Sequence, residues 1–245
     1  MLSETPLRTK ICRTDLTKIF AGFAFKLNTQ AEIQKITKQK EIMAINLQKG
    51  QRINLTKENG TTLSQACVGI NWGAIEKKSF FGGTSKEAVD LDGSCILYDS
   101  NKNATEVIYF GNLKSKNGSV KHSGDDLTGD VNGDDGLDNE VITVDFSNLD
   151  PAVEHVAMVL HSYKGQDFGT IPFASIRIYE GTPTNVREVF AKYDIANDKS
   201  FVGHVSMVMG VFYKRNGEWK FNAIGDATSD KKLEQTVKTV QEKYL

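Results

Sequence analysis

The chain has 245 residues, of which 39% are hydrophobic and 25% are charged, and its formal net charge is −1. This length allows a proper buried core, and the hydrophobic fraction excludes the composition of a disordered chain. A net charge near zero gives no general reason to expect nucleic acid or an anionic membrane as a partner.

The first 42 residues differ from the rest because they are basic and almost free of glycine. We interpret residues 1–42 as an N-terminal extension that is helical or disordered, with residues 31–42 as the candidate helix. An upstream translation start is the alternative, since Met43-Ala-Ile-Asn resembles a natural beginning. Residues 19–25 fall short of the roughly 20 apolar residues that span a bilayer. We expect them to form a buried or partner-facing patch, with a weak signal peptide as the alternative.

From residue 43 onward, short β-type runs are separated by glycine, asparagine and aspartate. Residues 156–160 are continuously apolar, which predicts a central strand buried on both faces. Residues 141–146 alternate between two faces, and the pair Asn216-Gly217 predicts a hairpin turn. The predicted strands are 65–72, 94–98, 106–110, 141–146, 155–163, 173–179, 187–194, 201–213 and 217–224.

The end of the chain, residues 229–245, has the pattern of an amphipathic helix. Its apolar residues are spaced by four, three and four positions, which places them on one stripe. We expect Ser229 or Asp230 to cap the start of this helix. The stripe consists of Leu233, Val237, Val240 and Tyr244.

Many short strands with few helices predict an all-β fold, a sandwich of two antiparallel sheets. We assign residues 43–245 to one such domain and expect the C-terminal helix to pack its stripe on the sandwich. A partner-binding helix is the alternative.

The three cysteines, Cys12, Cys67 and Cys95, lie far apart in the sequence. They form no CxxC pair or Cys/His cluster that would indicate zinc, and an odd number of distant cysteines argues against a disulfide framework. This pattern fits a reducing compartment, so we expect a cytoplasmic protein.

The segment from residue 125 to residue 140 combines many carboxylates with glycines and contains no lysine or arginine. Crowded carboxylates repel one another, so either the loop stays open and solvated or a cation draws it closed. Hard oxygen donors on a flexible backbone suit Ca²⁺, which accepts about 6–8 oxygens, whereas zinc prefers histidine or cysteine. The carboxylates are Asp125, Asp126, Asp130, Asp134, Asp135, Asp138 and Glu140.

Part of this segment resembles an EF-hand but departs from it. Asp130-x-Asn132-x-Asp134 matches the first three ligand positions. Gly136 then comes one residue late and Glu140 one residue early, and the segment leads into a strand instead of a helix. We therefore predict a calcium loop between β-strands, with a solvated loop that holds no ion as the alternative.

A second cluster places Asp90, Asp92 and Ser94 at alternate positions. Alternate residues of an extended chain share a face, so we expect these three oxygens to converge. Aspartates before a strand are often only turn formers. Together with the acidic loop, however, this cluster strengthens the prediction of one or two calcium ions.

Several motifs also follow one another in a fixed order along the chain. They include Met43-Ala-Ile-Asn-Leu-Gln-Lys-Gly, Asp90-Leu-Asp-Gly-Ser, Gly118-Ser-Val-Lys-His-Ser-Gly-Asp-Asp-Leu-Thr-Gly, Gly133-Asp-Asp, Lys192-Tyr-Asp-Ile, Ser206-Met-Val-Met-Gly and Gly217-Glu-Trp-Lys-Phe. In this combination the chain resembles the TerD family of bacterial tellurium-resistance proteins, particularly its TerZ- and TerX-like branch, from about residue 43 to about residue 227.

The resemblance implies a calcium-binding β-sandwich without catalytic activity and a role in resistance to tellurite and other stresses. It also implies assembly with other tellurium-resistance proteins near the membrane, with self-association as a further option. Asp126 stands where many members have Asn, and Gly129 is expected to contribute a carbonyl. Many members have Asp where Gly73 stands, and residues 136–139 resemble an insertion. The ligands carried over are Asp90, Asp92, Asp125, Asp134, Asp135 and Glu140, and the residue patterns add Ser94 and Asp130.

Two other functions compete with this one. Paired carboxylates serve as general acid and base in glycosidases, so a metal-dependent hydrolase built on the acidic cluster is one alternative. An exposed Gly/Asp loop is poor surroundings for the raised pKa that such chemistry needs. The other alternative is a small-ligand-binding sandwich with Trp72, Trp219 or Tyr163 as a platform, although such aromatic residues are more often core. We therefore expect a calcium-dependent interaction or scaffold module and not an enzyme.

Overall fold

The computed structural model of the protein describes residues 45–46, 49–55, 62–78, 82–196 and 198–245. These residues belong to a single unit, Ala44–Leu245. The predicted N-terminal extension 1–42, with its candidate helix and Cys12, lies outside the described residues.

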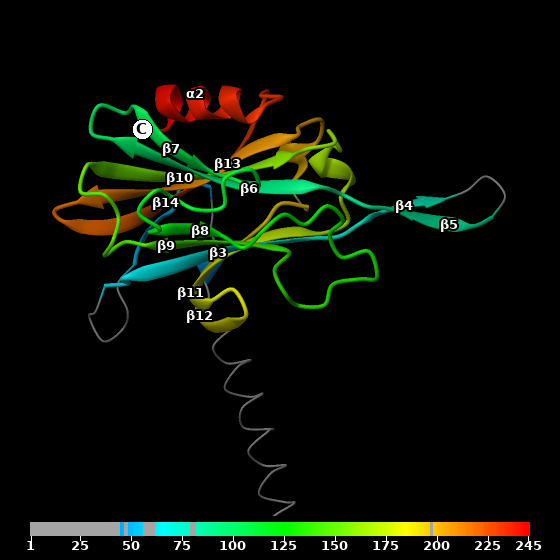
Figure 1. Cartoon of the computed structure of the whole chain (residues 1–245). Coiled ribbons are helices and arrows are strands. Elements are labelled where there is room, and N and C mark those ends of the chain that lie inside the picture. Colours follow the sequence, from blue (N-terminus) through cyan, green and yellow to red (C-terminus); the bar gives the residue numbers. More distant parts are fainter. Residues whose placement is uncertain (1–44, 47–48, 56–61, 79–81, 197) are drawn as a thin grey trace, which may run out of the picture. The chain divides into compact units, whose positions relative to one another are not determined.

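Two six-stranded sheets pack face to face (Figure 1). All neighbouring strands are antiparallel except β1 and β12, which are parallel at the edge of the first sheet. The predicted sandwich is therefore confirmed, with one parallel pair added. The first sheet has the order β1 (Ile45–Asn46), β12 (Asn185–Asp194), β11 (Ala174–Thr182), β3 (Gln65–Trp72), β9 (Glu140–Asp145) and β8 (Val120–His122). The second sheet has the order β2 (Arg52–Asn54), β14 (Glu218–Thr228), β13 (Ser206–Arg215), β10 (Val153–Ser162), β6 (Leu91–Asp99) and β7 (Ala104–Ile108).

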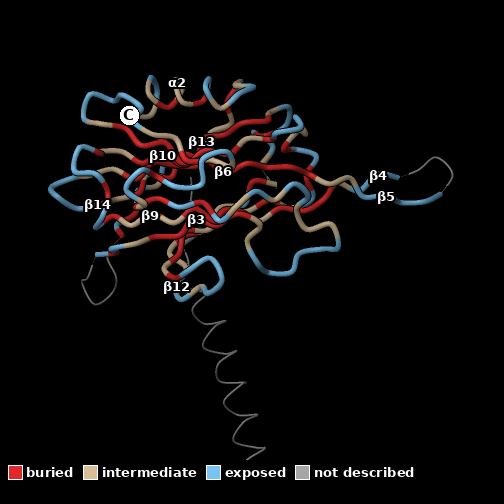
Figure 2. The backbone as a smooth tube through the Cα atoms, in the orientation of Figure 1, coloured by how far each residue is buried: buried red, intermediate tan, exposed pale blue. Residues whose placement is uncertain are grey.

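The apolar run in β10 is buried on both faces, as its continuous pattern predicts. Val156, Met158 and Leu160 lie in the core between the sheets. Ala157 and Val159 belong to a second cluster on the outer face of the second sheet. Figure 2 shows the buried positions concentrated between the two layers and under the C-terminal helix.

The helix α2 (Leu233–Lys243) covers this outer face, and the predicted stripe packs on it. The start of the helix differs from the prediction. Lys232 occupies the N-cap position without a side-chain hydrogen bond, so neither Ser229 nor Asp230 caps the helix. Residues 229–232 instead carry the chain from β14 to the helix, and Asp230 Oδ1 accepts a hydrogen bond from Thr239 Oγ1 at 3.1 Å.

The predicted hairpin turn is confirmed, since Asn216 and Gly217 both have positive φ between β13 and β14. The predicted start of the strand 201–213 is wrong. Residues 199–201 form a 3-10 turn, η2 (Lys199–Phe201), and β13 begins only at Ser206. A second 3-10 turn is η1 (Phe168–Thr170). The strands β4 (Ile75–Lys78) and β5 (Thr84–Glu87) pair as a hairpin that projects from one end of the sandwich (Figure 1).

Cys67 and Cys95 are buried free thiols. Among the described residues, no helix combines the length and the apolar character needed to cross a bilayer.

Candidate metal centre

The acidic segment connects β8 to β9 at the end of the sandwich from which the β4–β5 hairpin projects (Figure 1). Its course is tied to the neighbouring strand β3, because Asp130 N donates to Trp72 O at 2.9 Å. It is also tied to the residues before β6, since Val89 N donates to Thr128 O at 3.2 Å. The segment therefore lies against both the end of β3 and the start of β6.

Three carboxylates from two parts of the chain converge here. One oxygen each of Asp90, Asp92 and Asp125 lies within 4.8 Å of the others, and we call these residues the first carboxylate group. Asp90 and Asp92 are buried, at 2% and 5% exposure, whereas Asp125 is exposed. The alternate spacing of Asp90, just before β6, and Asp92, within it, thus brings these two aspartates together, while the expected convergence of Ser94 with them stays a prediction.

The pKa values of Asp92 and Asp125 reflect the crowding of negative charge in this group. Burial, followed by repulsion from Glu140, Asp90 and Asp125, raises the pKa of Asp92 to about 8. Burial and the charge of Asp90 also raise the pKa of Asp125. A cation placed among these oxygens would favour their charged forms and reverse both shifts.

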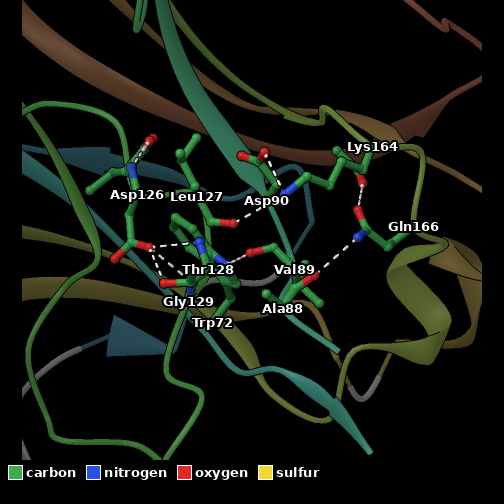
Figure 3. Close-up of polar contacts among 12 residues, drawn as sticks. Trp72, Ala88, Val89, Asp90, Asp126, Leu127, Thr128, Gly129, Lys164 and Gln166 are labelled. Atoms are coloured by element: carbon green, nitrogen blue, oxygen red, sulfur yellow. Dashed lines mark hydrogen bonds and ion pairs between the residues drawn. The ribbon is translucent and has the colours of Figure 1, made fainter. Parts of the chain in front are cut away.

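The negative charge of the Asp90 carboxylate is only partly compensated by other groups of the protein. Lys164 Nζ lies 3.2 Å from Asp90 Oδ2 and donates to Leu127 O at 3.3 Å (Figure 3). The other oxygen, Asp90 Oδ1, is buried and has no hydrogen-bond partner within the described part of the chain. An unpaired buried carboxylate oxygen is unfavourable, and a metal ion is one group that would satisfy it.

Glu140, the first residue of β9, holds the two sheets together at the site. Its carboxylate is fully buried and accepts hydrogen bonds from Gly93 N at 2.8 Å and Asp126 N at 3.3 Å. His122 Nε2 lies 3.4 Å from it, while His122 Nδ1 accepts a hydrogen bond from Gly124 N. The structure therefore places Glu140 beside the first carboxylate group with its oxygens engaged by main-chain donors.

Asp126 and Gly129 shape the loop. Asp126 Oδ1 accepts hydrogen bonds from Thr128 N, Thr128 Oγ1 and Gly129 N at 2.9–3.0 Å (Figure 3). Burial tends to raise the pKa of Asp126, but these hydrogen bonds outweigh it and the pKa is lowered. Gly129 has φ +63°, and a Cβ there would overlap the indole of Trp72, so the tight turn requires glycine.

A second carboxylate group consists of Asp130, Asp134 and Asp135, whose oxygens also lie within 4.8 Å of one another. It is more exposed than the first. Asp134 Oδ1 accepts from Asn71 Nδ2 and Gly136 N, and Asp130 Oδ2 accepts from Asp135 N. These oxygens already serve the turns of the loop, so an ion would have to share them.

Ser94 is buried on β6 two residues beyond Asp92 and lines the neighbouring pocket. The predicted aromatic platform is only partly present. Trp72 and Trp219 are buried, at 0% and 7% exposure, and cannot offer a surface to a ligand, whereas Tyr163 is 63% exposed.

The sequence patterns missed two residues that position the site. Asp138 is buried over Gly69, where any Cβ would overlap its carboxylate, and Arg177 Nε lies 2.8 Å from Asp138 Oδ1. Burial raises the pKa of Asp138 despite this arginine. Lys164 is the other missed residue. Asp138 lies in a segment rich in other aspartates, and Lys164 lies in no motif, so nothing in their spacing distinguishes them.

The sequence matches known proteins over most of its length. A family model described as the TerD domain matches residues 43–239. Tellurium resistance protein TerZ of Serratia marcescens is 36% identical over 185 residues, which cover 75% of this chain and 90% of that protein. Stress response protein SCP2 of Bacillus subtilis (strain 168) is 36% identical over 205 residues, which cover 80% of this chain and 98% of that protein.

A crystal structure of a homologue of telluride resistance protein (TerD) from Streptomyces coelicolor A3(2) has the same fold. It superposes with a TM-score of 0.55 at 15% sequence identity and covers 70% of this chain and 94% of that chain. The family model and the relatives agree with the resemblance carried by the motifs. The chain belongs to the TerD domain family.

Proposed function

We propose that the protein binds calcium at the first carboxylate group and acts in a stress response as a calcium-dependent interaction or scaffold module, not as an enzyme. The observation that carries this proposal is the convergence of Asp90, Asp92 and Asp125, two of them buried, with Asp90 Oδ1 left without a partner in the described part of the chain. The second carboxylate group is the candidate position for a second ion.

The chemistry of the donors supports calcium over other common ions. Both groups offer carboxylate oxygens, all from loop backbone except that of Asp92 in β6, and calcium tolerates irregular arrangements of about 6–8 oxygens. Mg²⁺ demands stricter octahedral geometry, and zinc prefers nitrogen or sulfur ligands. His122, the nearby histidine, has Nδ1 engaged by Gly124 N and Nε2 directed at Gly93 O and Glu140.

The names of the relatives, tellurium resistance and stress response, support the broad role. An ion held by the first carboxylate group would join the start of β6 to the acidic loop and so fix the shape of an exposed surface. We propose that this surface serves assembly with other tellurium-resistance proteins or with a second copy of the chain in the cytoplasm.

One observation favours the hydrolase alternative. Asp92 is a buried carboxyl beside a pocket, and its pKa of about 8 is the property of a general acid. The shift comes from burial and crowded carboxylates, so it fits a position for a cation equally well. Turnover of any substrate in a hydrolase panel, lost in Asp92→Asn, would favour the enzyme.

Thermal unfolding with calcium and with excess chelator tests the proposal. An ion at 100 times its dissociation constant adds about 2.7 kcal/mol, which corresponds to about 5–10 °C for a chain of this size. We expect Asp125→Asn to lose most of the shift and Asp134→Asn with Asp135→Asn to lose a smaller part. Glu218→Gln, an exposed carboxylate at the far end of β14, should keep the full shift. Equal melting of the unaltered protein in both buffers would refute calcium binding.

A further inference from the structure

A pocket of about 570 Å³ opens on the outer face of the second sheet, beside the start of α2. His161 of β10 belongs to its floor, and Leu233 and Val237 of α2 line one side. This volume lies within the range of pockets that hold small molecules, about 300–1,000 Å³. The pocket is therefore large enough for a compound with two fused rings.

Three aromatic rings line another part of the pocket and pack edge to face. The ring centroids of Tyr109 and Phe110 are 5.2 Å apart with an interplanar angle of 79°. Those of Phe110 and Tyr163 are 5.6 Å apart at 87°. Tyr163 ends this row and is 63% exposed. Because aromatic rings prefer edge-to-face and offset contacts with one another, a flat aromatic ligand would extend the row better than a saturated ring of the same size.

The charged residues of the pocket favour an uncharged ligand. Among the described residues that line it, Asp92 is the charged residue that is buried, but its carboxyl group already faces the other members of the first carboxylate group. The remaining charged residues, Lys231, Lys232 and Glu234, are exposed, and solvent screens them. A charged group on a ligand would therefore leave water without a buried partner of opposite charge.

The floor also offers one polar group that can orient a ligand. His161 Nδ1 pairs with Ser206 Oγ, and in the described part of the chain the other ring nitrogen, Nε2, has no hydrogen-bond partner. Pockets for small molecules combine apolar walls with a few such polar groups. An aromatic ring with a hydroxyl group matches this combination.

We propose that this pocket binds a small uncharged aromatic compound that carries a hydroxyl group, with its ring against Phe110 and Tyr163 and its hydroxyl bonded to His161. The inference does not rest on the proposed calcium site, because these three residues belong to neither carboxylate group.

2-Naphthol is the probe for the pocket, in calorimetric titrations of the full chain in chelator. Decahydro-2-naphthol, its saturated analogue, should bind about fivefold more weakly because it loses the aromatic contacts. 2-Naphthoate and 2-naphthylmethylammonium, which carry opposite charges, should each bind about fivefold more weakly or less, because no buried group compensates their charge. No binding of 2-naphthol, equal binding of the saturated analogue, or tighter binding of either charged probe would overturn the proposal.

Variants of the aromatic row test its part in binding. Tyr163→Ala should weaken 2-naphthol binding about fivefold, whereas Tyr163→Phe, which keeps the ring, should leave it unchanged. Because Tyr163 is exposed, both variants should keep the fold. Tyr213→Ala, a tyrosine outside the pocket, should also keep the full affinity. Full 2-naphthol affinity in Tyr163→Ala would show that the row is not the binding wall.

A comparison with naphthalene tests the role of His161. 2-Naphthol should bind about threefold more tightly than naphthalene to the unaltered protein, because only 2-naphthol has the hydroxyl group. In His161→Leu the two probes should bind equally. If 2-naphthol keeps its advantage in this variant, the hydroxyl bonds to another group and the assignment of His161 is wrong.

Discussion

We expect Asp92→Asn to stabilise the metal-free protein while weakening its response to calcium. Burial and the nearby Glu140, Asp90 and Asp125 raise the pKa of Asp92 from its ordinary value of 3.8 to about 8. The folded chain therefore keeps a proton on Asp92 that the unfolded chain loses. The loss of folding free energy that this pKa shift causes is absent below about pH 4 and grows until the pH passes about 8. Stability therefore falls as the pH rises through this window.

At about pH 7, these two pKa values correspond to at most about 4 kcal/mol of lost folding free energy. Water and small movements near the carboxyl reduce this cost, so we expect Asp92→Asn to raise the free energy of unfolding by about 1–2 kcal/mol in chelator. Near pH 4 the two proteins should differ little in stability, because the carboxyl is then protonated in the folded state and close to half protonated in the unfolded state.

Urea denaturation between about pH 4 and pH 8, with chelator and then with calcium, measures both effects. The advantage of Asp92→Asn should grow with pH in chelator, and calcium should then stabilise the unaltered protein more than the variant. Glu218→Gln controls for the loss of a surface charge. The account of the crowded carboxylates would be wrong if Asp92→Asn were no more stable than the unaltered chain near pH 7 in chelator.

The loop and helix contacts give further expectations, each measured by urea denaturation. Gly129→Ala should lower the free energy of unfolding by about 2–4 kcal/mol because φ is positive and the new Cβ overlaps an indole. Gly136→Ala, with positive φ but open space, should cost only about 1 kcal/mol, and equal costs would contradict the overlap. Arg177→Met should cost about 2–4 kcal/mol by leaving Asp138 buried without its partner, and an unchanged midpoint would show that the loop is held otherwise. Val240→Ala should cost about 1–3 kcal/mol because it opens the α2 contact with the second sheet, and no loss would contradict that packing.

Most of the sandwich is predictable because its strands have strong local patterns. β3 matches the predicted range 65–72, and β10 is buried on both faces as its apolar run indicates. β4, β5 and β8 are not predictable in this way, since they are short, and β4 and β5 are largely exposed and polar. Their pairing is decided by neighbouring strands and not by their own composition.

The C-terminal helix α2 is likewise predictable from the sequence only in part. The stripe from Leu233 to Tyr244 is visible in the spacing, but its first turn is not, because residues 229–232 first have to carry the chain from β14 to the outer face of the sheet. A capping residue in the sequence caps a helix only if the path of the chain places it there.

The candidate site was predictable as a set of acidic residues but not as an arrangement. Spacing along the sequence does not tell that Asp125 joins Asp90 and Asp92, while Asp130, Asp134 and Asp135 form a separate group. It also does not distinguish an aspartate that faces other carboxylates from one that folds the loop, as Asp126 does. These differences arise from the tertiary contacts of β6, β9 and the loop between β8 and β9.

Equilibrium dialysis of the metal-stripped full chain against calcium, followed by metal analysis, tests the central claim most directly. We predict that each chain retains one or two calcium ions and that Asp125→Asn retains one fewer. Retention of no calcium above the level of the dialysis buffer would contradict the claim and leave the converging carboxylates as a feature of the fold without a role in metal binding.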